Sequence, residues 1–235
     1  MRIHDTKLSR AEYLSTQIAR SEAKFSYCKV SVQDVGRYAD VVNRHRLREG
    51  DSAPAGPIVC LGSRNGREID LFRSQFFGSP WRRGMMRILE RRTHSFTSWF
   101  SPLEGVGRSS VSALSASSVV GVELNPRAAR SDVWVGSFDA MPPDWSHRFS
   151  VAYSNSFDQS EDPDRTAREW GRIVRPRGYV IFCFSKNAAP TLSDPVGGLT
   201  LEDVLGLFGG ELVYFCDRGS RSGYSEVIMR MKGSA

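Results

Sequence analysis

The sequence predicts an α/β fold, with a mostly parallel sheet of seven strands and helices on both faces. Short apolar runs alternate with amphipathic helical stretches, which is the pattern of a parallel sheet covered on both sides. Near the end of the chain, two further apolar runs flank a turn containing glycine and serine, which is typical of an antiparallel hairpin. The expected strands are 58–61, 119–122, 133–135, 151–153, 179–184, 211–216 and 225–231.

Two helices are expected before the first strand of the sheet. Ser9 and Ser31 each begin a capping-box pattern, in which a short polar residue precedes an acid by three positions and apolar residues follow at helical spacing. A segment rich in glycine and proline then indicates a linker. The expected parts are helices over about 9–24 and 32–46, a linker at 49–57, an N-terminal helical extension over 1–56 and an α/β domain over 57–235.

Further helices are expected within the α/β domain, one with Ile69, Phe72 and Phe76 on a single face and another over 164–174. The connection that follows the first of them is long, because it spans roughly 40 residues where two to six are usual. We interpret it as an insertion over about 78–118. It contains the arginine-rich segment Trp81–Arg92 and then the aromatic residues Phe96, Trp99 and Phe100.

The composition is that of an ordinary globular chain of 235 residues, with 40% hydrophobic residues and a net charge of +6. It has no run of 18 apolar residues, so we expect no transmembrane segment. The first 25 residues lack the apolar stretch of a secretory signal, and we expect a cytoplasmic protein. The cysteines are widely spaced and have no neighbouring histidine at ligand spacing, so we expect reduced thiols and no zinc site: Cys28, Cys60, Cys183 and Cys216.

One loop has the features of a ligand site. The expected strand at 58–61 runs directly into Gly62-Ser63-Arg64-Asn65-Gly66, and a helix begins after it. Glycine lets backbone N–H groups approach a ligand closely, and a helix N-terminus adds partial positive charge. By itself the pattern also fits a structural turn.

Residues after the next strands favour the ligand interpretation. Glu123 ends the second strand, where an acid in nucleotide-binding sheets accepts hydrogen bonds from ribose hydroxyls. A surface glutamate at a strand tip is the alternative. Phe138 and Asp139 follow the third strand, and Asn155 ends the fourth.

This ordered series resembles the class I S-adenosylmethionine-dependent methyltransferases, especially members whose glycine loop reads Cys-Leu-Gly-x-Arg-x-Gly. The resemblance covers about residues 57–232 and includes the Pro176-Arg177-Gly178 step and the late hairpin. It implies a seven-stranded, Rossmann-like methyltransferase sheet with a reversed final hairpin. It also implies S-adenosylmethionine as cofactor at the carboxyl ends of the strands, with S-adenosylhomocysteine as product. A nicotinamide enzyme, the rival nucleotide interpretation, would have a fuller GxGxxG sequence.

The resemblance also implies which residues contact the cofactor, from its methionine part through the ribose to the adenine. Asn155 would face the reacting centre. The implied cofactor-binding residues are Gly62, Ser63, Arg64, Asn65, Gly66, Glu123, Leu124, Ser137, Phe138, Asp139 and Asn155.

The sequence departs from the family pattern at three positions. Cys60 replaces the usual acid of the first strand, and Arg64 replaces the middle glycine of the loop. Ser137 stands where an acid often follows the third strand. These departures leave a non-catalytic relative as an alternative.

The candidate catalytic residue is Asp158, beyond the fourth strand. Methyl transfer needs alignment and desolvation, and a hydroxyl acceptor also needs a base. Asp158 could instead cap the following helix or turn. Together with Glu161 and Asp162 it could bind a divalent cation, although these acids also fit a solvated loop, and His147 is expected on the surface.

We therefore expect an O-methyltransferase acting on a carbohydrate or another small metabolite. The Asn/Asp-Pro-Pro-Tyr sequence of amino-methyltransferases is absent at the fourth strand, which argues against N-methylation of a base. An RNA methyltransferase and a basic binding module without catalysis are the alternatives. The arginine-rich insertion could be a docked helix, a lid over an anionic acceptor, a membrane-surface or RNA contact or, like the N-terminal helices, a homodimer contact.

Overall fold

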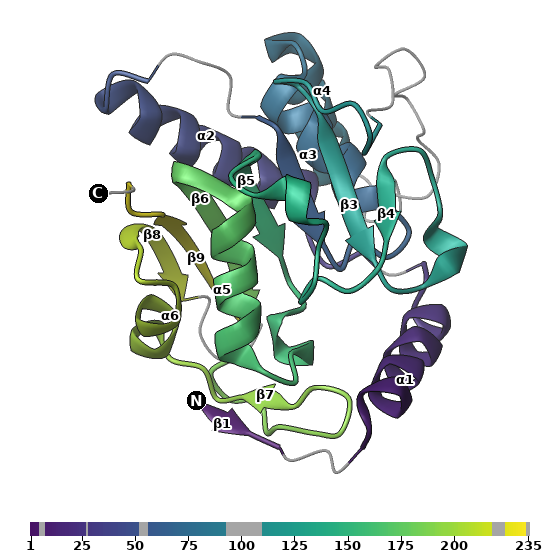
Figure 1. Ribbon diagram of the computed structural model, residues 1–235. Helices are drawn as coiled ribbons and strands as arrows, with labels where there is room; N and C mark the ends of the chain where they lie inside the picture. Colours follow the sequence, from purple (N-terminus) through teal and green to yellow (C-terminus); the bar gives the residue numbers. More distant parts are fainter. Residues whose placement is uncertain (5–7, 27, 52–55, 93–109, 218–223, 234–235) are drawn as a thin grey trace.

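The computed structural model describes residues 1–4, 8–26, 28–51, 56–92, 110–217 and 224–233 (Figure 1). Its central sheet consists of β2 (Ile58–Leu61), β3 (Val119–Glu123), β4 (Val133–Val135), β5 (Phe149–Ser154), β6 (Val174–Phe184), β8 (Glu211–Asp217) and β9 (Ser225–Arg230). The strand order is β4-β3-β2-β5-β6-β9-β8. The first five strands in this order are parallel, and β9 is antiparallel to both of its neighbours. The expected fold class is confirmed.

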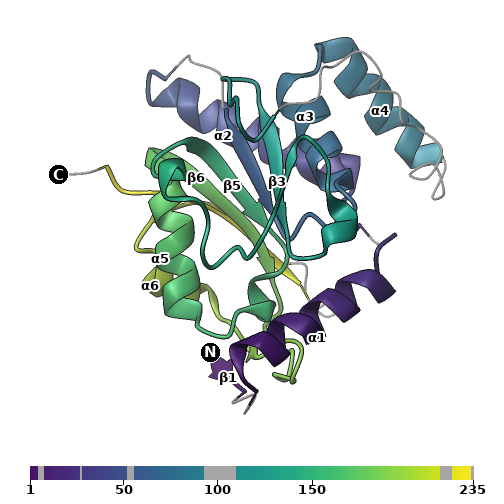
Figure 2. The same ribbon diagram turned by 45° about the vertical axis from the view of Figure 1, so that its right-hand side comes forward.

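Helices cover both faces of the sheet (Figures 1 and 2). On one face lie α2 (Val32–Arg48) and α3 (Arg67–Phe77), and on the other lie α5 (Pro163–Ile173) and α6 (Leu201–Phe208). Tyr38 and Phe72 fill the core of the first face, whereas Trp170 and Phe208 fill that of the second. Because parallel strands are buried on both faces, β2, β3 and β5 are buried along their whole length.

Helix α1 (Arg10–Ala23) lies across the carboxyl ends of the strands rather than on a face of the sheet (Figure 2). It begins with the predicted capping box, in which the Ser9 hydroxyl accepts from the N–H of Glu12 and the Glu12 carboxylate accepts from the N–H of Ser9. Helix α2 begins with the same arrangement at Ser31 and Asp34. Both expected N-terminal helices are confirmed.

Several elements have no counterpart among the sequence predictions. Strand β1 (Arg2–Ile3) pairs antiparallel with β7 (Val196–Gly197), and α6 is the fourth helix packed on the sheet. The arginine-rich segment forms α4 (Pro80–Arg92), while the insertion's aromatic residues Phe96, Trp99 and Phe100 lie outside the described residues. Among the helices of the described chain, none is long and apolar enough to cross a membrane. The short 3-10 turns are η2 (Pro126–Ala128), η3 (Pro143–Trp145) and η4 (Phe157–Gln159).

Candidate functional site

The glycine loop leads from β2 into α3 and is held against β3. Gly62 and Gly66 have φ angles of 76° and 77°, in the left-handed region that favours glycine. The N–H groups of Gly62 and Ser63 both donate to the carbonyl of Val122, over 2.9 and 3.1 Å. A ligand would therefore meet this part of the loop at its carbonyl groups and Cα atoms rather than at these N–H groups.

The carboxylate of Glu123 is 6% exposed and accepts three hydrogen bonds. Oε2 accepts from the N–H of Arg64 over 2.8 Å, and Oε1 accepts from the Ser21 hydroxyl over 2.9 Å and from the N–H of Asn125 over 3.1 Å. Arg64 has a φ of 46°, which is uncommon for a residue with a side chain. Since a carboxylate has about four lone-pair positions, one position on Oε2 is left for a further donor.

Helix α1 forms one wall of a pocket over these strand ends. The pocket contains about 410 Å³ of space, part of it open to solvent. Helix α1 contributes Gln17, Arg20 and Ser21 to the lining. The strand ends contribute predicted cofactor-binding residues: Gly62, Arg64, Glu123, Leu124 and Phe138.

The other predicted loop residues pack beside the pocket. Ser63 is fully buried, and its hydroxyl has no hydrogen-bond partner among the described residues. The Asn65 side chain accepts from the N–H of Arg67 over 3.1 Å, which begins α3. Phe138 faces the pocket and also packs edge-to-face on Trp170, with ring centroids 5.7 Å apart. Phe138 therefore joins the pocket to the core.

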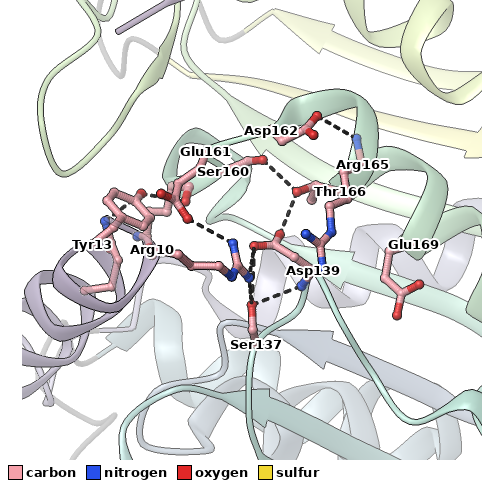
Figure 3. A network of polar contacts seen from close by, with 12 residues as sticks. Arg10, Tyr13, Ser137, Asp139, Ser160, Glu161, Asp162, Arg165, Thr166 and Glu169 are labelled. Carbon is pink, nitrogen blue, oxygen red and sulfur yellow. Dashed lines mark hydrogen bonds and ion pairs between the residues drawn. The ribbon is translucent and has the colours of Figure 1, made fainter. Parts of the chain in front are cut away.

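Ser137 and Asp139 belong to a polar network that fastens α1 over the site (Figure 3). Arg10 donates to Glu161 over 2.9 Å and to both Ser137 and Asp139 over 3.4 Å. The other oxygen of Asp139 accepts from the Thr166 hydroxyl over 2.6 Å. The network thus connects α1 with the loop after β4 and with α5, and Asp139 is engaged by protein groups.

Asn155 is bound at both ends of its amide. Its Nδ2 donates to Glu68 over 3.0 Å, and its Oδ1 accepts from the Ser156 hydroxyl over 3.0 Å. Glu68 is only 5% exposed, and burial raises its pKa to about 7. It is not among the predicted site residues, because an acid in the first turn of a helix is common for its favourable interaction with the helix dipole.

Asp158 lies in η4, directly beyond β5. Its Oδ1 is buried and has no hydrogen-bond partner among the described residues. Burial, and after it the charge of Asp194, raise the pKa of Asp158 to about 6, against the opposing effect of Lys29 and Arg20. Perturbed carboxyls of this kind are common at functional sites.

Asp158 does not cap the next helix, which was one of the two structural roles considered for it. Asp162 caps α5 by accepting from the N–H of Arg165 over 2.9 Å. Glu161 forms an ion pair with Arg10. Asp158, Glu161 and Asp162, the three acids considered as cation ligands, therefore each have different partners or surroundings. Within the part of the chain that the structure describes, no three His, Cys, Asp or Glu side chains are placed to hold a metal ion.

Lys29 is a second charged residue near Asp158 that the sequence patterns did not single out. Its ammonium group lies 2.9 Å from the centre of the Tyr224 ring. Burial lowers the pKa of Lys29, although the charges of Cys183 and Asp158 act in the opposite direction. Lys29, after α1, and Asp158, after β5, are therefore opposite charges close enough for each to affect the pKa of the other.

No family model matches this sequence, and no curated protein matches it either. Solved structures do match. The 1,6-didemethyltoxoflavin-N1-methyltransferase of Burkholderia thailandensis, with bound 1,6-didemethyltoxoflavin and S-adenosylhomocysteine, is similar at 12% identity and a TM-score of 0.54, over 98% of this chain and 94% of that one. A chain of the complex between the Haloferax volcanii Trm112 methyltransferase activator and the putative methyltransferase is similar at 14% identity and a TM-score of 0.50, over 97% and 99%.

The chain has the class I methyltransferase fold. The methyltransferase fold is not restricted to methyl transfer, because the [4+2]-cyclase SpnF is also similar, at 13% identity and a TM-score of 0.51 over 100% of this chain and 98% of that one. The matches therefore establish the architecture alone, and the reaction depends on the residues of the site.

Proposed function

We propose that this chain is an S-adenosylmethionine-dependent methyltransferase that acts on a hydroxyl oxygen of a carbohydrate or another small molecule. The observation that carries the proposal is the buried carboxylate of Glu123, at the end of β3 and in the wall of a pocket beside the glycine loop. An acid at this position of a doubly wound sheet is suited to ribose hydroxyls. Bound S-adenosylmethionine would supply a methyl group that is already activated on a sulfonium.

The residues of the pocket fit this cofactor. Glu123 has one lone-pair position left, and a second becomes available if the Ser21 hydroxyl leaves Oε1. Two positions would accept both ribose hydroxyls. Leu124 and Phe138 offer apolar surface for the adenine ring. Cofactor binding would then require the Ser21 hydroxyl to leave Oε1, by rotation of its side chain or by a shift of α1.

Asp158 supports an oxygen acceptor, because a hydroxyl has to lose its proton during transfer and an amine often does not. A carboxyl with a pKa of about 6 is mostly ionised at pH 7, and its buried Oδ1 has no protein partner among the described residues. Oδ1 would accept the acceptor's proton. The nearby ammonium group of Lys29 would stabilise the negative charge that develops on the hydroxyl oxygen.

Calorimetry with S-adenosylhomocysteine tests the cofactor part of the proposal. We expect the wild-type chain to bind and Glu123→Ala to lose at least about tenfold in affinity, because hydrogen bonds to charged groups contribute about 1.5–3 kcal/mol. Glu202→Ala, which removes an exposed carboxylate from α6, is the matched control and should bind like wild type. Absence of binding by the wild-type chain would contradict the proposal.

Methyl transfer to RNA is a second candidate, favoured by one surface of the molecule. Helices α2 and α4 border an open groove whose lining is mostly basic and polar, with one acid: Asp40, Asn43, Arg44, Leu47 and Arg83. Leu47 and the nearby α4 residue Trp81 are 67% and 72% exposed. Arginines with exposed apolar and aromatic side chains suit nucleic acid. Strongly salt-weakened RNA binding would favour this candidate, and the same binding without cofactor uptake would indicate a non-catalytic module.

A further inference from the structure

Glu68 is a buried acid to which none of the described residues bonds a cation. It lies in the first turn of α3 and is 5% exposed. Its Oε1 accepts one hydrogen bond, from Asn155 over 3.0 Å. Within the described residues, Glu68 forms no ion pair and Oε2 accepts no hydrogen bond. An ionised carboxylate in such a place is unfavourable unless a cation or further donors reach it.

Charged and titratable groups on several neighbouring segments affect the pKa of Glu68 or are affected by its charge. Arg64 of the glycine loop and Lys29 of the α1–α2 connection lower its pKa, and Glu123 of β3 raises it. Cys28, Cys60 and Tyr153 lie close enough for Glu68 to raise the pKa of each. Burial has a larger effect on the pKa of Glu68 than any one of these charges.

Glu68 is connected to the pocket by a short chain of hydrogen bonds. Asn155 donates to Glu68 and accepts from Ser156, and Ser156 lines the pocket next to Gly62. A Cβ atom at Gly62 would lie 2.8 Å from the Ser156 hydroxyl, so the loop and this chain are in close contact. The carboxylate therefore lies on the side of the glycine loop where the methionine part of a bound cofactor is expected.

We propose that Glu68 binds the ammonium group of the cofactor's amino-acid end. The proposal rests on the proposed function, since it requires that S-adenosylmethionine be the ligand. Cys60, on the adjoining strand, is a fully buried thiol and offers no charge. Glu68 is thus an acid that Asn155 and Ser156 connect to this end of the pocket, and an ammonium group would supply the missing cation.

Two ligands that differ only in the amino-acid end test the proposal. S-Adenosylhomocysteine carries the ammonium group, and 5′-methylthioadenosine lacks it but keeps the adenosine. By calorimetry we expect Glu68→Gln to weaken S-adenosylhomocysteine by about 10- to 100-fold, the effect of one charge-assisted contact. Affinity for 5′-methylthioadenosine should stay within about twofold, which also shows that the variant is folded.

The pH dependence gives a second measurement. Because the pKa of Glu68 is about 7, the wild-type affinity for S-adenosylhomocysteine should fall about tenfold from pH 8 to pH 6, as the carboxylate is protonated. The affinity of Glu68→Gln should vary less than about twofold over this range, as should wild-type affinity for 5′-methylthioadenosine.

The outcomes distinguish this proposal from the function on which it rests. If the wild-type chain binds neither ligand, the cofactor assignment itself fails. If wild type binds S-adenosylhomocysteine and Glu68→Gln binds it equally well, Glu68 is not the ammonium ligand and the proposed function stands. Equal weakening of both ligands in Glu68→Gln would also overturn the proposal, because it would indicate a structural role.

Discussion

Glu68→Gln should make the free protein more stable at alkaline pH. The substitution keeps the side chain's shape and an oxygen that can accept from Asn155, and it removes a charge that burial makes unfavourable. The pKa of Glu68 is about 7 in the folded chain against an ordinary 4.5. The folded chain therefore binds this proton more tightly, and stability is lost as pH rises from about 4.5 to about 7. At about 1.4 kcal/mol per pH unit, the loss is about 3 kcal/mol at pH 8.

Urea unfolding at pH 8 and pH 5, without ligand, measures this effect. We expect Glu68→Gln to gain about 3 kcal/mol at pH 8 and less than about 1 kcal/mol at pH 5. The gain at pH 8 corresponds to a rise in Tm of about 6–12 °C for a chain of this size. Glu202→Gln removes the same charge from an exposed position and should change stability by less than about 0.5 kcal/mol. A loss of stability in Glu68→Gln at pH 8 would refute the reasoning, because it would show that neighbouring cations already compensate the carboxylate.

Three further predictions concern the site and the core. Ser21→Ala removes a hydroxyl that donates to the Glu123 carboxylate. We expect calorimetry to show that the affinity for S-adenosylhomocysteine rises by up to about tenfold. A lower affinity would show that Ser21 contributes to ligand binding. Asp158→Asn should abolish methyl transfer to a hydroxyl acceptor while cofactor affinity stays within about twofold. Wild-type turnover should decline below about pH 6, because Asp158 is then protonated. Unchanged turnover in the variant would remove Asp158 from the base role. Asp132→Asn should cost about 3 kcal/mol in urea unfolding, because the fully buried carboxylate binds Arg73 over 2.8 Å; a loss below about 1 kcal/mol would show that the pair adds little.

The architecture could be predicted because its signals are local. Each strand of the sheet contains an apolar run, although β6 begins at Val174, before the polar step that precedes its apolar run at 179–184. The capping boxes at Ser9 and Ser31 define where two helices begin. Helix α6 and the β1–β7 pair were harder to predict, because α6 is short and two-residue strands have no periodicity. Their formation depends on tertiary contacts.

The site could be predicted only in part. The glycine loop and Glu123 follow strands directly, so their place is fixed by chain order. The bond from Ser21 to Glu123 joins residues 102 positions apart, and no local pattern indicates it. Glu68 and Lys29 look like ordinary surface charges in the sequence. Only their burial in the folded chain distinguishes them.

A crystal structure of the chain with S-adenosylhomocysteine would test the central claim most directly. We predict ribose hydroxyls within hydrogen-bond distance of Glu123, with the adenine against Phe138 and the Ser21 hydroxyl moved away from Oε1. A structure in which Ser21 remains bound to Glu123 and the ligand is absent from this pocket would contradict the account.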